Sequence, residues 1–186
     1  MMGRIVVTEF LTLDGRMSGP GNDQSWVTET FDGDMDEETL AQQRTVDLIL
    51  LGRVTYQELA GYWPTVRTDH PEITRHMNDT PKAVVSTTLD RAPWGDHAPA
   101  RVLTDLRRET VAAVKREVAG DIAVIGSASV VAELAALDLV DEYKLMLHPV
   151  VLGAGAPLFE NLDRRRFTHT RTRALANGVV VLHYAA

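Results

Sequence analysis

The chain has 186 residues, of which 45% are hydrophobic, and its formal net charge is -7. This length suits one domain with a buried core, this composition argues against disorder, and the negative charge argues against a nucleic-acid partner. Cysteine is absent, which excludes disulfides, thiolate metal sites and a cysteine nucleophile. No window approaches the roughly 18 apolar residues of a membrane span. We therefore expect one cytoplasmic domain over residues 1–186, not bound to a membrane.

The first third of the chain predicts a strand, a long loop and a helix. Residues 4–11 (RIVVTEFL) are rich in β-branched and aromatic types, which favours a strand. Residues 12–36 are rich in glycine and small polar residues at first and acidic later, which predicts a long loop. Such loops often act as lids, and an ordinary surface excursion is the alternative. A helix is predicted over 36–46, with Leu40 and Val46 facing inward.

The middle of the chain alternates apolar runs with helical patterns. The run 47–51 predicts a buried strand, and a helix is expected from Val54 to just before the YWP sequence at 62–64. Residues 83–87 predict another strand, and 101–103 a short one. This alternation is typical of a mostly parallel sheet covered on both faces.

The last third continues the alternation and then changes character. Thr104 is positioned to cap a helix over 105–118, which Gly120 would end. A strand over 122–125, a helix over 128–137 and a strand over 140–147 follow. Asn177-Gly178 between two strand-like runs predicts a C-terminal antiparallel hairpin.

Two stretches of similar form stand where a predicted strand ends and a helix begins: DLILLGRVT at 47–55 and DIAVIGSAS at 121–129. Each places a glycine and a hydroxyl residue at a helix N-terminus, where free N–H groups and the helix dipole favour an anion. Together the two turns could hold a diphosphate, and Arg53 could meet a further phosphate. Ordinary helix caps and a solvated arginine are the alternatives. Neither stretch is a G-x-G-x-x-G fingerprint or a P-loop.

Other chemistry finds less support in the sequence. The six histidines form neither H-x-x-x-H nor H-E-x-x-H, so we expect no metal site, and His148 before a proline suggests a structural role. No G-x-S-x-G elbow is present. Met17 and Trp26 are either packed anchors of the long loop or part of a lid.

Five segments, taken in order, resemble one known superfamily. They are TEFLTLDGRMSGPG, ILLGRVTYQEL followed by YWP, PKAVVSTTL, GDIAVIGSASVVAEL and LVDEYKLMLHPVVLGAGAPLF. The chain resembles the dihydrofolate reductase superfamily, in the branch of the reductase domain of the bifunctional riboflavin-biosynthesis deaminase-reductase and its small stand-alone relatives. The resemblance implies a three-layer αβα fold, an eight-stranded, mostly parallel sheet with an antiparallel C-terminal hairpin, NADPH across the strand ends, and a homodimer.

The resemblance also implies roles for particular residues. Residues implied to bind the cofactor are Gly15, Gly52, Arg53, Thr55, Ser86, Thr87, Ile125, Gly126, Ser127, Ala128 and Ser129. Among these, Ser86 and Thr87 correspond to positions beside the adenosine 2′-phosphate. Asp14 and Glu9 are candidate proton donors, directly or through a water, and Trp26 and Tyr56 are candidate substrate contacts.

The implied activity is NADPH-dependent reduction of a nitrogen heterocycle, similar to that of 5-amino-6-(5-phosphoribosylamino)uracil reductase. The chain departs from the family at two places. Asp32, Asp34 and Asp36 compete for the position of the folate-binding carboxylate, and Thr8-Glu9 stands where the riboflavin enzyme carries a basic residue. The first departure argues against folate reduction, and the second leaves the substrate open. The alternatives are a non-catalytic dinucleotide-binding module and a dihydrofolate reductase proper.

Overall fold

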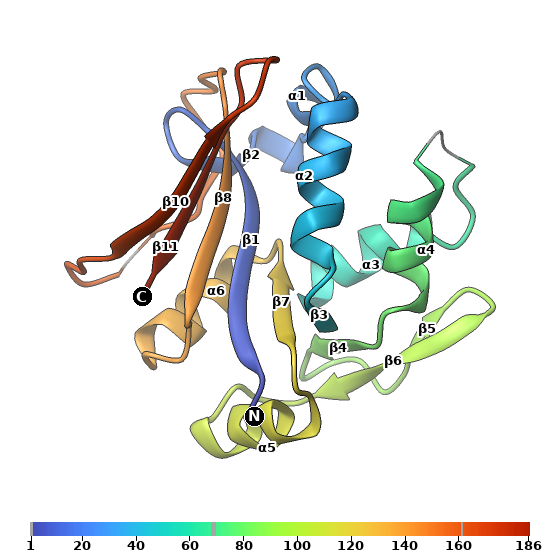
Figure 1. Ribbon diagram of the computed structural model, residues 1–186. Helices are drawn as coiled ribbons and strands as arrows, with labels where there is room; N and C mark the ends of the chain where they lie inside the picture. Colours follow the sequence, from blue (N-terminus) through green and yellow to red (C-terminus); the bar gives the residue numbers. More distant parts are fainter. Residues whose placement is uncertain (1, 68–69, 161) are drawn as a thin grey trace.

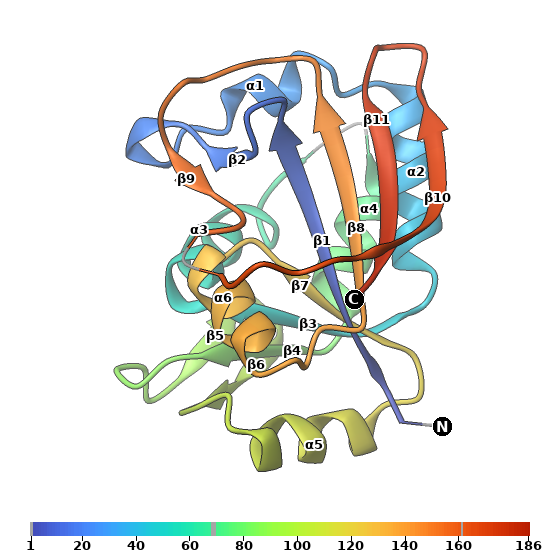
Figure 2. The same ribbon diagram turned by 90° about the vertical axis from the view of Figure 1, so that its left-hand side faces the viewer.

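The computed structural model describes residues 2–67, 70–160 and 162–186, which form three layers (Figures 1 and 2). The strands are β1 (Arg4–Thr12), β2 (Arg16–Ser18), β3 (Val46–Gly52), β4 (Lys82–Val85), β5 (Ala92–Trp94), β6 (His97–Leu103), β7 (Asp121–Ile125), β8 (Glu142–His148), β9 (Ala156–Pro157), β10 (Thr168–Ala174) and β11 (Val180–Ala185). The helices are η1 (Pro20–Asn22), α1 (Ser25–Thr28), α2 (Gly33–Gln43), α3 (Arg53–Tyr62), α4 (Pro71–Asp79), α5 (Arg108–Glu117) and α6 (Ala128–Ala136). Within the described ranges, no helix is both long and apolar enough to cross a membrane.

The main sheet has the strand order β10-β11-β8-β1-β7-β3-β4-β6-β5. The six strands from β8 to β6 run parallel, and the β10–β11 hairpin joins β8 antiparallel, as the sequence predicts. The sheet has nine strands instead of eight because the short β5 pairs antiparallel with β6. Strands β2 and β9 form a separate two-stranded sheet.

Apolar side chains on the two faces of the sheet fill separate cores. One core lies under α5 and α6 and includes Val7, Leu50 and Val124. Another lies under α3 and α4 and includes Ile49 and Leu51. Neighbouring residues of β3 thus serve opposite faces, as the two-residue period of a strand requires. A strand buried on both faces carries the continuous apolar run seen in LILL.

Several predicted boundaries are wrong for local reasons. Helix α2 begins earlier than residue 36, because the Asp32 side chain accepts hydrogen bonds from the backbone N–H groups of Asp34 and Met35. Val46 belongs to β3, not to this helix. Thr104 does not cap α5, which begins only at Arg108. The predicted loop 12–36 is only partly irregular, since it contains β2, η1, α1 and the start of α2.

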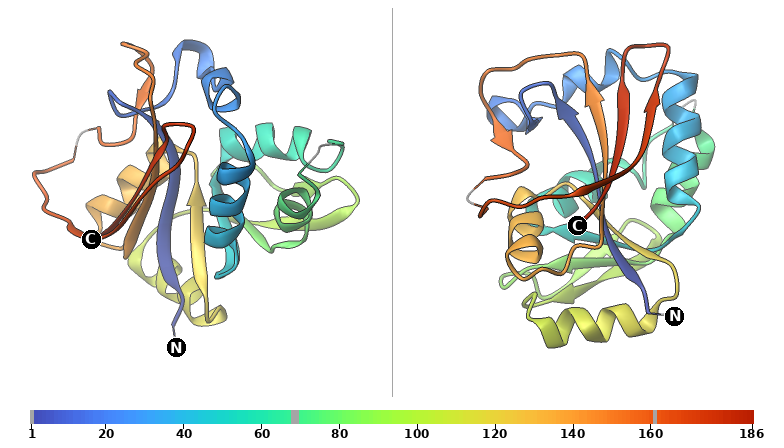
Figure 3. Two further views of the ribbon diagram at one scale, coloured as in Figure 1. Left: turned by 45° about the horizontal axis from the view of Figure 1, so that its top comes forward. Right: turned by 60° about the vertical axis from the view of Figure 1, so that its left-hand side comes forward.

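The segment after β1 is fastened to the segment after β8. The Asp14 carboxylate accepts hydrogen bonds from the backbone N–H groups of Gly153 and Leu152, at 2.9 and 3.3 Å. Pairing of β2 with β9 closes the same contact, and Figure 3 shows the chain arching from the top of β8 to β9. Gly155 allows this approach, because a Cβ there would lie 1.9 Å from the carbonyl oxygen of Ser18.

Helix α1 and the residues after it are held against the end of β8 by aromatic and polar contacts. Trp26 is 3% exposed and meets the ring of His148 edge-on at 5.0 Å. The Oγ1 of Thr30 lies 2.7 Å from Nδ1 of His148, while Nε2 of His148 is buried without a partner among the described residues. The sequence predicts that Met17 and Trp26 are either packed anchors of the loop or part of a lid. Both side chains are buried, which supports the role of packed anchors. The structural role predicted for His148 agrees with these contacts.

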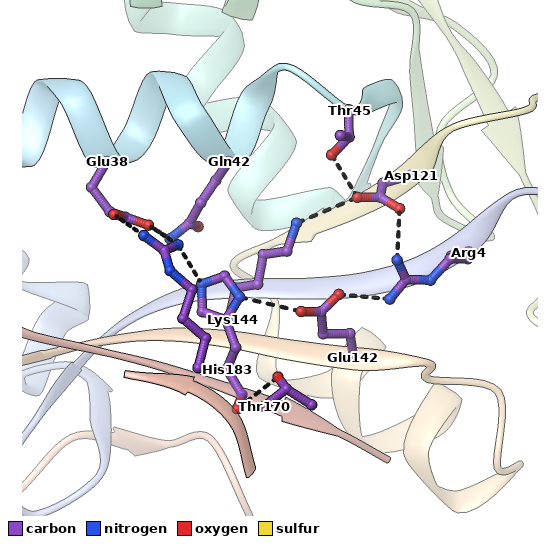
Figure 4. Close-up of polar contacts among 10 residues, drawn as sticks. Arg4, Glu38, Gln42, Thr45, Asp121, Glu142, Lys144, Thr170 and His183 are labelled. Atoms are coloured by element: carbon purple, nitrogen blue, oxygen red, sulfur yellow. Dashed lines mark hydrogen bonds and ion pairs between the residues drawn. The ribbon is translucent and has the colours of Figure 1, made fainter. Parts of the chain in front are cut away.

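A buried polar network attaches α2 to the sheet (Figure 4). Glu38 is fully buried and accepts hydrogen bonds from both terminal nitrogens of Arg171, at 2.9 and 3.0 Å, and from Arg173 at 3.1 Å. Burial opposes ionisation of Glu38, but the hydrogen bonds, led by that from Arg171, outweigh it and hold its pKa below the usual range. Further along, Lys144 pairs with Asp121 at 3.3 Å. Helix α2 thus rests on ion pairs as well as on apolar contacts.

We predict that Glu38→Gln lowers the free energy of unfolding by about 1.5–3 kcal/mol, because it removes charge-assisted hydrogen bonds from a buried position. Its neighbour Glu37 provides a matched control, since its side chain is 68% exposed and also pairs with Arg173. Glu37→Gln should change stability by less than about 0.5 kcal/mol. Urea denaturation measures both values, and equal losses for the two variants would contradict the role given to Glu38.

We also predict acid sensitivity from His148, whose pKa burial lowers to about 4. An unfolded histidine titrates near pH 6.5, so the unfolded chain takes up this proton first as pH falls. The stability contributed by neutral His148 is complete above about pH 6.5 and is lost as pH falls toward about 4. In denaturant titrations at several pH values, His148→Asn should lose less stability over this window than the wild type. Parallel pH profiles of stability for the wild type and His148→Asn would contradict the role given to His148.

Candidate functional site

A cleft of about 510 Å³ lies where β3, β4 and β7 end. Parallel strands bring their carboxyl ends to one edge of a sheet, and ligands of open α/β sheets bind there. The lining residues are Met17, Ser18, Asn22, Gln24, Gly52, Arg53, Val54, Thr55, Glu58, Val85, Ser86, Thr87, Thr88, Gly126, Ser127, Ala128, Ser129, Val130, Glu133 and Ala156. The cleft therefore contains both glycine turns singled out in the sequence.

The two glycine turns are joined directly by the side chain of Ser127. Its Oγ accepts a hydrogen bond from the backbone N–H of Gly52 at 2.8 Å and lies 2.7 Å from Oγ1 of Thr55. The turns pack so closely that a Cβ on Gly52 would lie 2.5 Å from Ser127 Oγ, and one on Gly126 2.8 Å from Thr55 Cγ2. Both positions thus require glycine for space.

The second turn also holds an uncommon backbone conformation. Gly126 and Ser127 both have positive φ, at 61° and 66°. Glycine adopts this region freely, but serine does so at a cost, and such strain concentrates at ligand-binding sites. The conformation turns the chain from β7 into α6, so that the first turn of α6 faces the cleft.

Both helices that begin at the cleft have N-termini suited to an anion. Neither α3 nor α6 has an acidic residue in its first turn or a hydrogen bond from the side chain of its N-cap residue. Their first N–H groups and helix dipoles therefore favour a negatively charged ligand. Arg53 is the one cation among the lining residues, and Gln57 steadies its guanidinium at 3.0 Å.

The turn after β4 supplies hydroxyl groups at one end of the cleft. The Oγ of Ser86 accepts hydrogen bonds from the N–H groups of Thr88 and Leu89, both at 3.1 Å, so this hydroxyl shapes the turn. Thr87 and Thr88 are exposed and line the cleft. The sequence prediction named Thr87 but missed Thr88. Ser86 in the sequence STTL carries the signal, because a serine hydroxyl often bonds the backbone two residues on.

Six residues expected at the site lie outside the cleft lining: Glu9, Asp14, Gly15, Trp26, Tyr56 and Ile125. Ile125 packs into the core under α3 and α4. The hydroxyl of Tyr56 donates to the carbonyl of Pro93 at 2.6 Å, which places it toward β5. Trp26 packs on His148. The substrate contacts proposed for Tyr56 and Trp26 stay predictions.

The two candidate proton donors lie in opposite environments. Asp14 sits beside Gly15 in the turn between β1 and β2, and its hydrogen bond from Thr12, together with the N–H groups of Gly153 and Leu152, lowers its pKa to about 2. Glu9 is 7% exposed, and burial raises its pKa well above the usual range, against a smaller opposing effect of the Gly126 N–H. Asp14 is thus ionised near neutral pH, whereas burial favours the protonated form of Glu9.

The three aspartates that compete for a folate-binding role are engaged in other contacts. Asp32 caps α2, and Asp34 accepts the N–H of Ala176 at 3.3 Å. Oδ2 of Asp36 lies 2.6 Å from Nδ1 of His70. These contacts give each carboxylate a structural partner.

The sequence prediction missed the far walls of the cleft. Asn22 and Gln24 belong to the segment read as an irregular loop, and Glu58 and Glu133 lie one helical turn inside α3 and α6. The sequence does carry a signal for Glu58 and Glu133, because residues three or four apart share a helix face. Glu58 follows Thr55 by three positions, and Glu133 follows Ser129 by four.

Comparisons with known proteins agree with this fold. The profile of the RibD C-terminal domain matches residues 4–181. The Bacillus subtilis (strain 168) protein YyaP, itself uncharacterised, is 31% identical over 97% of this chain and 94% of its own length. A structure from Shewanella sp. PV-4, described as a candidate riboflavin biosynthesis protein, superposes with a TM-score of 0.81 at 19% identity, over 100% of this chain and 98% of that one.

Dihydrofolate reductase from Enterococcus faecalis, solved with NADP(H) and RAB-propyl, has the same fold, with a TM-score of 0.65 and 12% identity over 100% of this chain and 97% of that one. The superfamily resemblance seen in the sequence is thereby confirmed. The match to the domain profile extends over nearly the whole chain, so the protein belongs to the RibD C-terminal domain family, the riboflavin-biosynthesis reductase branch of the dihydrofolate reductase-like fold.

Proposed function

We propose that the protein is an NADPH-dependent reductase of a nitrogen heterocycle. The observation that carries this proposal is the joined pair of glycine turns, which directs two uncapped helix N-termini and one arginine at a single cleft. Such an arrangement suits a ligand with several phosphates. The dinucleotide would lie with its diphosphate between the Gly52 and Gly126 turns.

The adenosine end of the ligand would lie toward the turn after β4. Thr87 and Thr88 offer exposed hydroxyls there, and Arg53 offers a positive charge within the same cleft. These are the groups that a 2′-phosphate needs, because hydroxyl donors and a guanidinium pair well with phosphate oxygens. The acids Glu58 and Glu133 also line the cleft, so Arg53 is central to any preference for the phosphorylated cofactor.

The nicotinamide end would lie near Met17, Ser18 and Ala156, where β2 meets β9. When bound, the cofactor supplies the hydride, and the protein supplies orientation and exclusion of water. The fastened segments around Asp14 and Gly153 hold this end of the cleft in place. We propose a pyrimidine or related heterocycle, with or without a ribosyl phosphate, as the substrate.

Reduction of a C=N bond also consumes a proton. Asp14 is a poor source near neutral pH because it is ionised. Burial favours the protonated form of Glu9, but Glu9 lies on the α6 side of the sheet, level with Gly126. We therefore propose a water ordered by the loop around Asp14 as the proton source.

A thermal-shift titration with NADPH and NADH tests the proposal. NADPH at about 100 times its dissociation constant should add about 2.7 kcal/mol, which is a rise of roughly 5–11 °C for a domain of this size. NADH should give a smaller rise in melting temperature, and Arg53→Gln should reduce the difference between the rises that the two cofactors cause. No shift with either cofactor, for a folded sample, would remove the basis for an NADPH-dependent enzyme.

We predict that Gly126→Ala abolishes measurable cofactor binding. The new Cβ would meet Thr55 Cγ2 at 2.8 Å on a backbone with φ of 61°, so the turn must shift away from Gly52. Gly61→Ala is the matched control, because Gly61 lies in α3 with open space around its Cβ position. The control should stabilise the fold by about 0.5–1 kcal/mol and leave cofactor affinity unchanged. If calorimetric titration showed that a folded Gly126→Ala variant binds NADPH with wild-type affinity, the prediction would be refuted.

A further inference from the structure

Glu9 lies beneath the turn that begins at Gly126. In the parallel pairing of β1 with β7, Thr8 is opposite Ile125, so Glu9 is level with Gly126. The residues of β1 that share its face, Ile5, Val7 and Leu11, all belong to the core under α5 and α6. The Glu9 carboxyl group therefore points to the α6 side of the sheet, at the N-terminal end of that helix.

The environment of this carboxyl group is unusual for a core position. Glu9 is 7% exposed, and its Oε1 is buried without a hydrogen-bond partner among the described residues. The backbone N–H of Gly126 faces the carboxyl group and opposes the rise of its pKa, but burial dominates. Burial favours the neutral form of this carboxyl group, and Gly126 approaches it as a donor, so we place its proton on Oε1. Oε1–H is then a buried donor that lacks an acceptor.

An unsatisfied buried donor destabilises a fold, and an apolar side chain of the same size would avoid that cost. The residue that this donor adjoins, Gly126, lines the cleft and forms one side of the double turn. An acceptor delivered to that turn by a ligand would satisfy the Glu9 proton. A phosphate oxygen is such an acceptor, and a neutral acid can approach it without charge repulsion.

We propose that Glu9 is a cofactor-positioning residue, a carboxylic acid that donates its proton in a hydrogen bond to a diphosphate oxygen of the bound dinucleotide at the Gly126 turn. This inference rests on the proposed NADPH binding and assigns to that site a contact from below the turn. Glu9 then acts together with the backbone N–H groups of α6. In this role it holds the diphosphate and does not supply the proton of the reduction.

Two substitutions of similar size separate this role from a structural one. Glu9→Met removes the donor and the unsatisfied group, so the unliganded protein should melt at the same temperature or higher, while NADPH affinity falls about 10- to 100-fold. Glu9→Gln keeps an N–H donor and should stay close to wild-type affinity. The control Ile5→Val lies on the same strand and face, level with Ile122, and should lower the melting temperature without changing affinity.

Isothermal titration of the full chain with NADPH and with 2′-phospho-ADP-ribose, which lacks nicotinamide, measures these effects. Equal losses for both ligands in Glu9→Met support the proposal, and a loss confined to NADPH overturns the diphosphate as acceptor. Wild-type affinity in Glu9→Met, or equal weakening in the Met and Gln variants, overturns the donor role. Absence of NADPH binding to the wild type would instead refute the proposed function itself.

An infrared measurement on the wild type gives the same test without the Met variant. The C=O stretch of the protonated carboxyl group, identified by its disappearance in Glu9→Gln, should shift when NADPH binds. An unshifted band at saturating NADPH would contradict a hydrogen bond between Glu9 and the cofactor.

Discussion

The hydrogen bond from the Gly52 N–H to the Ser127 hydroxyl is the contact on which the site depends. It brings together two strand-to-helix turns whose hydrogen-bonded residues, Gly52 and Ser127, are 75 positions apart in the sequence. Each turn alone would be an ordinary helix start. Joined through Ser127, they direct two helix N-termini to one place, and the local field there favours an anion more than either terminus could alone.

The rest of the fold supports this contact from two sides. Beneath it, β3 and β7 are neighbours in the sheet, and their apolar residues fill cores on both faces, which fixes the distance between the turns. Above it, the Asp14 contacts and the β2–β9 pair hold the loop that closes one end of the cleft. Helix α2 is attached differently, through the buried Glu38 with Arg171 and Arg173, so its position depends on ionisation as well as on packing.

The sequence predicts the parts of this arrangement that follow local rules. Apolar runs locate the central strands, Asn177-Gly178 locates the hairpin, and the two glycine turns locate the cleft. It does not predict contacts that join distant segments. Asp14 resembles a catalytic acid until Gly153 is brought beside it. Thr104 resembles a helix cap, but its neighbour Asp105 accepts the N–H of Arg107, and α5 begins only at Arg108. Ser127 suggests a simple cap, and its bridge to Gly52 depends on the pairing of β3 with β7.

A crystal structure of the chain grown with NADPH would test the joined turns most directly. We expect diphosphate oxygens within hydrogen-bond distance of backbone N–H groups from both turns, at residues 52–55 and 126–129, with the contact between Ser127 and Gly52 preserved. The adenosine 2′-phosphate should lie near Arg53 or the hydroxyls of Thr87 and Thr88. A dinucleotide bound elsewhere, or one that touches a single turn while the other keeps only its helix-capping role, would contradict the account.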